Sequence, residues 1–215
     1  RKCDYCDFNS YGIGSFKVSK EIVYKYLEAV LKEAEIRSFI VKELKTKVSS
    51  VYLGGGTPTF LPVELIDEFL SGVLKIFPLA SSAEVTIEAN PQTINVRDLS
   101  MLREVGITRL SIGVQSLKND ILETLGRIHS ASDSIFAFRS GKKAGFDNIN
   151  VDLIYAIPGQ TMKDWCSTLD EILILKPEHI STYGLMLEKG TPLWNKVELG
   201  MEEPCDEDLG IDMYY

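Results

Sequence analysis

Five short apolar segments alternate with amphipathic segments along the chain, and this alternation restricts the fold more than any other feature. Alternating units of this length predict parallel strands joined by helices, because parallel neighbours need long, right-handed connections. The sequence therefore indicates an α/β fold with a parallel sheet, either an open doubly wound sheet or a barrel. The five predicted strands are Val48 to Leu53, Ala83 to Ala89, Arg109 to Gly113, Asn148 to Ile154, and His179 to Tyr183.

The segments between these strands carry helix signals. Ser19 is a candidate N-cap for a first helix that reaches toward Leu44. Its apolar residues recur every three to four positions and predict one packing stripe, formed by Ile22, Val23, Tyr26, Leu27, Val30, Leu31 and Ala34. Later helices are predicted from Pro62 onward and over Asn95 to Val105, Asn119 to Leu125, Asp133 to Ala144, and Met162 to Leu175.

Polar and glycine residues fall at or just past the carboxyl ends of successive predicted strands. They are Gly54 to Thr57, Glu88, Gln115, Asp152 and Tyr183. In a barrel, the carboxyl ends of all strands open on one mouth, where binding and catalytic residues gather. This placement favours a barrel over an open sheet.

Composition and charge exclude several classes of protein. A chain of 215 residues that is 45% apolar and 25% charged can bury one substantial core. Its net charge of -8 disfavours nucleic-acid binding, and no apolar run approaches the ~20 residues that cross a bilayer. The cysteines at 3, 6, 166 and 205 form no disulfide framework for a chain of this size, so we expect a reducing, cytoplasmic location.

Two motifs carry candidate chemistry. Cys3 and Cys6 form a Cys-x-x-Cys pair, which by itself fits a redox pair, half of a zinc site, or ligands of an iron-sulfur cluster. The triplet Gly54 to Gly56 follows a strand, where glycines often only relieve a tight turn. Three in a row exceed that need and leave backbone groups open to a ligand.

Taken in order, the motifs resemble the oxygen-independent coproporphyrinogen III oxidase group of the radical S-adenosylmethionine (SAM) superfamily. The resemblance implies a [4Fe-4S] cluster on Cys-x3-Cys-x2-Cys, and a reduced cluster that cleaves SAM to a 5′-deoxyadenosyl radical. Cys3 and Cys6 would be two ligands, with the third four positions before Cys3. The motifs are CDYCDF at 3–8, GGGTPT at 54–59, EANP at 88–91, GVQS at 113–116, GRIH at 126–129 and DLIYAIPGQT at 152–161.

The resemblance also implies a SAM site. Alternatives remain for each residue: Glu88 could cap a helix or form a salt bridge, and Arg127 could lie on a solvated loop. His129 is as much a structural candidate as a functional one, and His179 is expected to be structural. The implied SAM-binding residues are Tyr5, Gly55, Gly56, Thr57, Glu88, Gln115, Arg127, Asp152 and Met186.

For the fold, the resemblance implies a partial (β/α)6 barrel of the TIM type, with a sixth strand immediately before the cysteine loop. Because the chain starts at Arg1 without a methionine, we expect a fragment of a longer protein. Residues 1–215 would form a radical SAM core domain truncated at both ends. Residues 190–215 would begin the connection to a C-terminal domain.

Within the group, the oxidases typically carry an additional cysteine one residue after the last cluster cysteine. This chain has Asp7 and Phe8 there, as haem chaperones of the group do. We therefore expect a haem chaperone that binds haem and transfers it to apoproteins, with a reductant such as flavodoxin or ferredoxin. The alternatives are a coproporphyrinogen III oxidase, whose substrate is a porphyrin precursor, and a cluster-free metabolic TIM-barrel enzyme.

Overall fold

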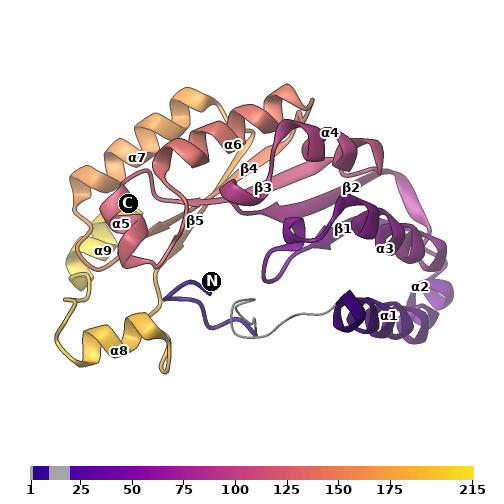
Figure 1. The fold of residues 1–215 in the computed structure, drawn as a ribbon, viewed down its shortest axis with the longest axis horizontal. Helices are drawn as coiled ribbons and strands as arrows, with labels where there is room; N and C mark the ends of the chain where they lie inside the picture. The colour runs from indigo at the N-terminus through magenta and orange to yellow at the C-terminus, as the bar shows by residue number, and fades with distance from the viewer. Residues whose placement is uncertain (1, 10–19) are drawn as a thin grey trace.

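Five parallel strands form one sheet in the order of the sequence, β1-β2-β3-β4-β5. The computed structural model describes residues 2–9 and 20–215. The sheet curls into a half-barrel with helices along its outer side (Figure 1), so the α/β barrel-type prediction is confirmed. The strands are β1 Val48–Leu53, β2 Leu79–Ala89, β3 Arg109–Gln115, β4 Ile149–Tyr155 and β5 His179–Gly184.

Most helices lie where the sequence pattern predicted them, with the largest differences at the two ends of the chain. α3, α4, α6 and α7 cover the convex side of the sheet (Figure 1). The helices are α1 Lys20–Arg37, α2 Phe39–Leu44, α3 Val63–Ile76, α4 Val96–Glu104, α5 Asn119–Thr124, α6 Ala131–Lys143, α7 Met162–Leu175, α8 Pro192–Glu198 and α9 Glu207–Tyr214, with 3-10 turns at Pro58–Phe60 and Pro91–Thr93.

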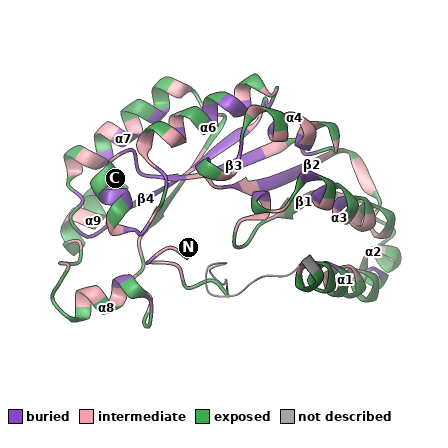
Figure 2. Cartoon of the chain, viewed as in Figure 1, coloured by how far each residue is buried: buried purple, intermediate pink, exposed green. Residues whose placement is uncertain are grey.

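The core lies between the central strands and the helices that cover them. Leu110, Ile149 and Val151 are fully buried there. The fit is close, because a Cβ added at Gly141 on α6 would come within 2.8 Å of the Ile149 Cδ1. Figure 2 shows the central strands mostly buried and α1 mostly exposed. Along β3 and β4, apolar residues that pack under the helices alternate with polar residues such as Ser111 and Asp152 on the inner face, and this alternation made the strands recognisable in the sequence.

The first predicted helix differs from expectation in length and in burial. It ends at Arg37, and a second helix, α2, runs on to Leu44. The predicted packing stripe is wrong at two positions, since Ile22 is 58% and Tyr26 66% exposed, whereas Leu27 is buried. α1 packs mainly on α3, and this contact covers only part of the stripe. Ser19, the predicted N-cap, lies outside the described residues.

The start of β2 and the packing of the C-terminal stretch also differ from the prediction. β2 begins at Leu79, four residues before the prediction, because Leu79 pairs with Val48 of β1 across a register shift. In the stretch 190–215, α9 packs against α7 and β4, and the Trp165 indole donates to the Met213 carbonyl at 2.9 Å. This segment therefore adds to the same core, and its role as a connection to another domain stays a prediction. No described helix is long and apolar enough to cross a membrane.

Candidate functional site

The carboxyl ends of the strands and the N-terminal loop enclose a cavity of about 1370 Å³. Nearly all the residues that the sequence singled out line it, although they lie as far apart in the chain as Cys3 and Met186. Gly55 is not part of the lining but lies next to Gly56, which is. The predicted residues on the cavity wall are Cys3, Tyr5, Cys6, Gly56, Thr57, Glu88, Gln115, Arg127, Asp152 and Met186.

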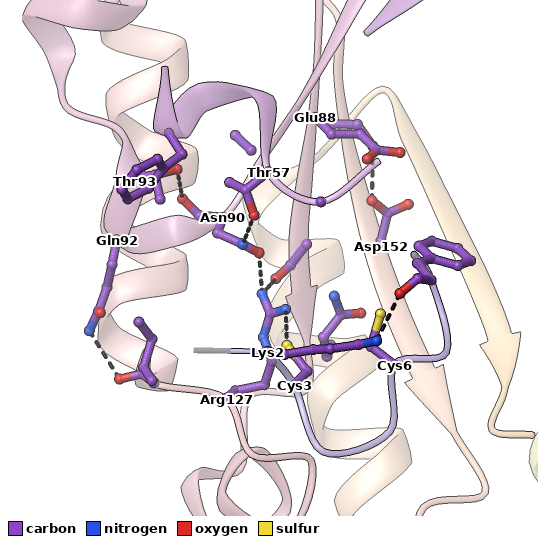
Figure 3. Close-up of a pocket in the computed structure, with 18 of the residues that line it drawn as sticks. Lys2, Cys3, Cys6, Thr57, Glu88, Asn90, Gln92, Thr93, Arg127 and Asp152 are labelled. Carbon is purple, nitrogen blue, oxygen red and sulfur yellow. Dashed lines mark hydrogen bonds between the residues drawn. The ribbon is translucent and has the colours of Figure 1, made fainter. Parts of the chain in front are cut away.

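The N-terminal loop presents two thiols to this cavity (Figure 3). A turn brings Cys3 and Cys6 together, since the Cys6 amide donates to the Cys3 carbonyl at 3.2 Å. The Lys2 ammonium donates to the Phe8 carbonyl at 2.8 Å and closes the loop. Both cysteines are half-buried free thiols. The loop therefore has a defined shape with its sulfur atoms on the cavity side.

Tyr5 lies between the two cysteines and anchors the loop on a small apolar cluster. Burial raises the pKa of the Tyr5 phenol to about 12, so the phenol stays neutral at physiological pH. The cluster below it is separate from the main core and consists of Ile121, Leu125, Ile154, Ile157 and Leu193. Tyr5 thus serves a packing role in addition to lining the cavity.

Arg127 joins the cysteine loop to the strand ends. Its guanidinium donates to the Cys3 sulfur at 3.3 Å and to the Gly113 carbonyl at 2.9 Å, and it also contacts the Asn90 side chain (Figure 3). The Nε of Arg127 is buried and has no partner among the described residues. The solvated-loop alternative is therefore wrong, because Arg127 points into the cavity.

The glycine triplet forms an open ledge at the end of β1. Gly55 and Gly56 have φ angles of 83° and 60°, a left-handed conformation that favours glycine. Glu88 supports this ledge, since its carboxylate accepts from the Gly55 amide at 3.0 Å and from the Tyr52 hydroxyl at 2.9 Å. Burial and the bond to Glu88 raise the pKa of Tyr52 to about 12. Glu88 therefore orders the ledge, and no helix cap or salt bridge is described for it.

Gln115 reaches the cavity through an irregularity in β3. The register shifts between Ile112 and Gln115, and Gln115 adopts a φ of 66°, which is unusual for a residue with a side chain. Its amide folds back over Gly113, where an added Cβ would lie only 2.9 Å from the Gln115 Nε2. Backbone strain of this kind is typical of functional sites.

Asp152 is held by two buried residues that the sequence analysis did not single out. Ser111 donates to one carboxylate oxygen at 2.9 Å, and Asn150 donates to the other at 2.8 Å. Both partners are buried on neighbouring strands, so the carboxylate has a fixed orientation at the mouth. Asp152 lies in the middle of β4, and Asn150, two places before it on the same face of the strand, was the available signal, whereas Ser111 comes next to it only through strand pairing. Met186 lies on the cavity wall and is 71% exposed.

The two histidines lie outside the cavity lining. His129 is buried, and its Nε2 lies 3.0 Å from the Val114 carbonyl. Burial, assisted by the charge of Arg127, lowers the pKa of His129 to about 4. His179, at the start of β5, contacts the Asn150 side chain. Both histidines are therefore structural in this fold.

Acidic residues outnumber basic residues on the cavity wall. The basic side chains are Lys2 and Arg127, and both already donate to protein groups. The surrounding potential therefore disfavours polyanionic ligands. The acidic residues on the wall are Asp7, Glu64, Glu68, Glu88, Asp152 and Glu188.

Comparison with known proteins places this arrangement in a family, since the model of the radical SAM superfamily matches residues 1–172. This chain belongs to the radical SAM superfamily. Among its relatives, the heme chaperone HemW of Bacillus subtilis is 34% identical over 213 residues, covering 99% of this chain and 54% of the relative. The mitochondrial radical S-adenosyl methionine domain-containing protein 1 of Danio rerio is 36% identical over 214 residues, covering 98% of this chain and 46% of the relative.

The solved structures support the same assignment. Coproporphyrinogen III oxidase (HemN) from Escherichia coli, described as a radical SAM enzyme, aligns with a TM-score of 0.83 and 25% identity. The alignment covers 100% of this radical SAM chain and 48% of HemN. The chain spans about half the length of the curated relatives it matches. Membership of the superfamily removes the cluster-free metabolic barrel from the alternatives.

Radical SAM membership implies a [4Fe-4S] cluster and SAM, and the cavity fits both. Two free thiols lie on its wall, and thiolates are the usual protein ligands of such clusters. The open glycine ledge and the unpartnered Nε of Arg127 leave polar groups for a ligand. Within residues 2–9 and 20–215, no three His, Cys, Asp or Glu side chains are grouped so that they could hold a metal ion.

Proposed function

We propose that this chain is the cluster- and SAM-binding domain of a haem chaperone similar to HemW. The observation that carries the proposal is that Cys3 and Cys6 face the same cavity as the glycine ledge and the strand-end polar residues. A cluster held by these thiols would lie beside the surface that seats SAM. The third thiolate, four positions before Cys3, stays a prediction.

The residues on the cavity wall, together with Gly55 beside them, would contact different parts of SAM. We expect Gly55, Gly56 and Thr57 to seat the methionine part, because no side chain covers the two glycines. The carboxylates of Glu88 and Asp152 are already oriented, and Gln115 adds a strained amide. Arg127, Tyr5 and Met186 would complete the contacts. When bound, the reduced cluster supplies one electron to the sulfonium of SAM.

Charge on the cavity wall favours the chaperone over the oxidase. Coproporphyrinogen carries four propionates and haem two, so like charges at a binding site reduce the affinity more for coproporphyrinogen. The wall carries the acidic excess described above, and Arg127 is engaged by Cys3 and Gly113. In addition, Asp7 and Phe8 stand where the oxidases of the resembled group carry an extra cysteine. We therefore propose haem as the cargo, apoproteins as receivers, a flavodoxin or ferredoxin as reductant, and the cytoplasm as location.

The decisive experiment uses the full-length protein, reconstituted anaerobically with iron and sulfide. We expect a low-temperature EPR signal of a reduced [4Fe-4S] cluster that changes when SAM is added, and a haem absorption band on titration with haem. Cys3→Ala and Cys6→Ala should abolish the cluster, whereas Cys166→Ala, which removes an exposed thiol on α7, should retain it. Full iron and sulfide in both cysteine variants would refute the ligand assignment.

A second assay separates the chaperone from the oxidase. The reconstituted protein is incubated anaerobically with SAM, reductant and coproporphyrinogen III, and the products are separated by chromatography. We expect no decarboxylated product. Protoporphyrinogen formation at a catalytic rate would establish the oxidase alternative instead.

A further inference from the structure

Asp4 lies between the two cysteines, yet its bonds go to distant parts of the chain. Its amide donates to the Leu125 carbonyl at 3.0 Å, and its carbonyl accepts from the Leu193 amide at 2.8 Å. Its carboxylate forms an ion pair with Lys196 at 3.1 Å. These bonds hold the cysteine loop against the end of α5 on one side and against α8 on the other.

The fit at Asp4 depends on a glycine. Gly126 has a φ of 67°, and a Cβ added there would overlap the Asp4 carboxylate. The Asp4 side chain therefore fills the space that any other residue at 126 would occupy. Asp4 is only 6% exposed, so water contributes little to its interactions.

Lys196 provides the charge that this buried carboxylate requires. Burying a carboxylate is costly unless it is paired and hydrogen-bonded. The Lys196 side chain is 33% exposed and extends from α8, whose residue Leu193 is fully buried on the small cluster below Tyr5. Packing of Leu193 thus holds α8 in place, and α8 in turn places Lys196 beside Asp4. We call the contacts of Asp4 with Leu125, Gly126, Leu193 and Lys196 the Asp4 clamp.

We propose that the Asp4 clamp holds the cysteine loop in its cluster-binding shape, and that Lys196 is a positioning residue that acts through Asp4. The proposal rests on the proposed function, since it assigns a role to the loop that carries Cys3 and Cys6. Cysteine pairs on a free loop would have to be ordered during cluster insertion, at a cost in conformational entropy. The clamp removes this cost, because it orders the loop through contacts that involve neither sulfur.

The first test measures the loop without a cluster. Alkylation of Cys3 and Cys6 by iodoacetamide is followed by mass spectrometry in the apo full-length protein, with exposed Cys166 as internal reference. We expect Lys196→Met to accelerate alkylation of both loop cysteines roughly tenfold, because a bond to a charged, buried partner is lost. Lys143→Met, which removes an exposed lysine on α6, should change nothing, and Lys196→Arg should restore the slow rate. Equal rates in Lys196→Met and the parent would overturn the proposal.

The second test measures the cluster. After anaerobic reconstitution, Lys196→Met and Asp4→Asn should each lose iron and sulfide in air roughly tenfold faster and shift the reduction potential of the cluster. The double variant should be no worse than either single one, since both remove the same interaction. Additive losses would show that Lys196 does not act through Asp4. If Lys196→Met were poorly folded by circular dichroism, Lys196→Gln would replace it.

The two proposals fail in different ways. A parent protein that takes up no cluster refutes the proposed function but leaves the alkylation result standing. A parent that takes up a cluster, with Lys196→Met identical to it in iron retention and potential, refutes the Asp4 clamp alone. Gly126→Ala is an independent test, because its Cβ would displace the Asp4 side chain from the opposite side. A cluster that is as stable in air in this variant as in the parent would also contradict the proposed role of the Asp4 clamp.

Discussion

The central layer of the sheet and the N-terminal layer are both regular secondary structure, but they are stabilised differently. The central layer, β2 to β4 with α4 and α6, contains fully buried side chains such as Leu99, Leu110 and Ile149. The N-terminal layer, α1, α2 and β1, has no buried residue in α2 or β1 (Figure 2). Periodicity predicted helices in both layers. Only tertiary contacts decide which of those helices bury their apolar faces.

The largest difference should come from truncating a central side chain. Leu110 on β3 is completely buried against α6. Leu110→Ala should therefore reduce the free energy of unfolding by about 3 kcal/mol, through lost burial and a residual cavity. Urea denaturation followed by circular dichroism measures it. A loss below about 1 kcal/mol would mean that the central layer repacks around the gap.

Acid should weaken the central layer through His129. The pKa of His129 is lowered to about 4 in the folded chain, against about 6.5 when unfolded, so only the unfolded chain takes up the proton between these values. Stability should be full above pH 6.5 and fall by about 3 kcal/mol as the pH decreases to 4. His129→Gln should flatten this part of the profile. An unchanged slope in that variant would locate the acid sensitivity elsewhere.

Substitutions of Gln115 should have a smaller effect, because they test the strain of its backbone separately from the contact of its side chain with SAM. Gln115→Gly relieves the positive φ of the β3 irregularity, so it should be more stable than Gln115→Ala by about 1 kcal/mol. Both variants lack the amide and should bind SAM more weakly in the reconstituted full-length protein. If Gln115→Ala equalled Gln115→Gly in stability, the backbone at this position would not be strained.

The smallest effects are expected in the N-terminal layer. Ile36 is 66% exposed, so Ile36→Ala should change the free energy of unfolding by less than about 0.5 kcal/mol. The same holds for Tyr26→Ala. When these variants and Leu110→Ala are measured in one series of urea denaturations, the difference in burial between the N-terminal layer and the central layer is tested directly. Losses above 1 kcal/mol would show that the exposed face of α1 is covered in solution.

The sequence predicted strands and helices well where local signals and burial agree. Thr161 and Asp164 form a capping box, and α7 begins at Met162 as predicted. A similar box at Ser130 and Asp133 starts α6 at Ala131, two residues before the prediction, because the Ser130 hydroxyl accepts from the Asp133 amide and caps the helix there. The early start of β2 at Leu79 could not be read locally, since pairing with β1 extends a segment of weak strand character.

In the candidate site, the sequence likewise predicted some residues and missed others. Motifs identified the residues that line the cavity, including Cys3, Cys6 and Arg127. The partners that orient them were not recognisable: Tyr52 beside Glu88, and Lys196 beside Asp4, lie 36 and 192 residues away in sequence. Nothing in either partner's own neighbourhood marks it, because an ordinary tyrosine or lysine acquires such a role only through the fold.

Strands that are neighbours in this sheet are also neighbours in the sequence. A loop at the mouth that makes few contacts with other segments can therefore be exchanged or lengthened while the strand pairing beneath it is preserved, whereas the cysteine loop is bonded to α5 and α8 through Asp4. In such an architecture, evolution or protein engineering can change individual loops, and with them the ligand that is bound, while the residues that bind the cofactor are retained.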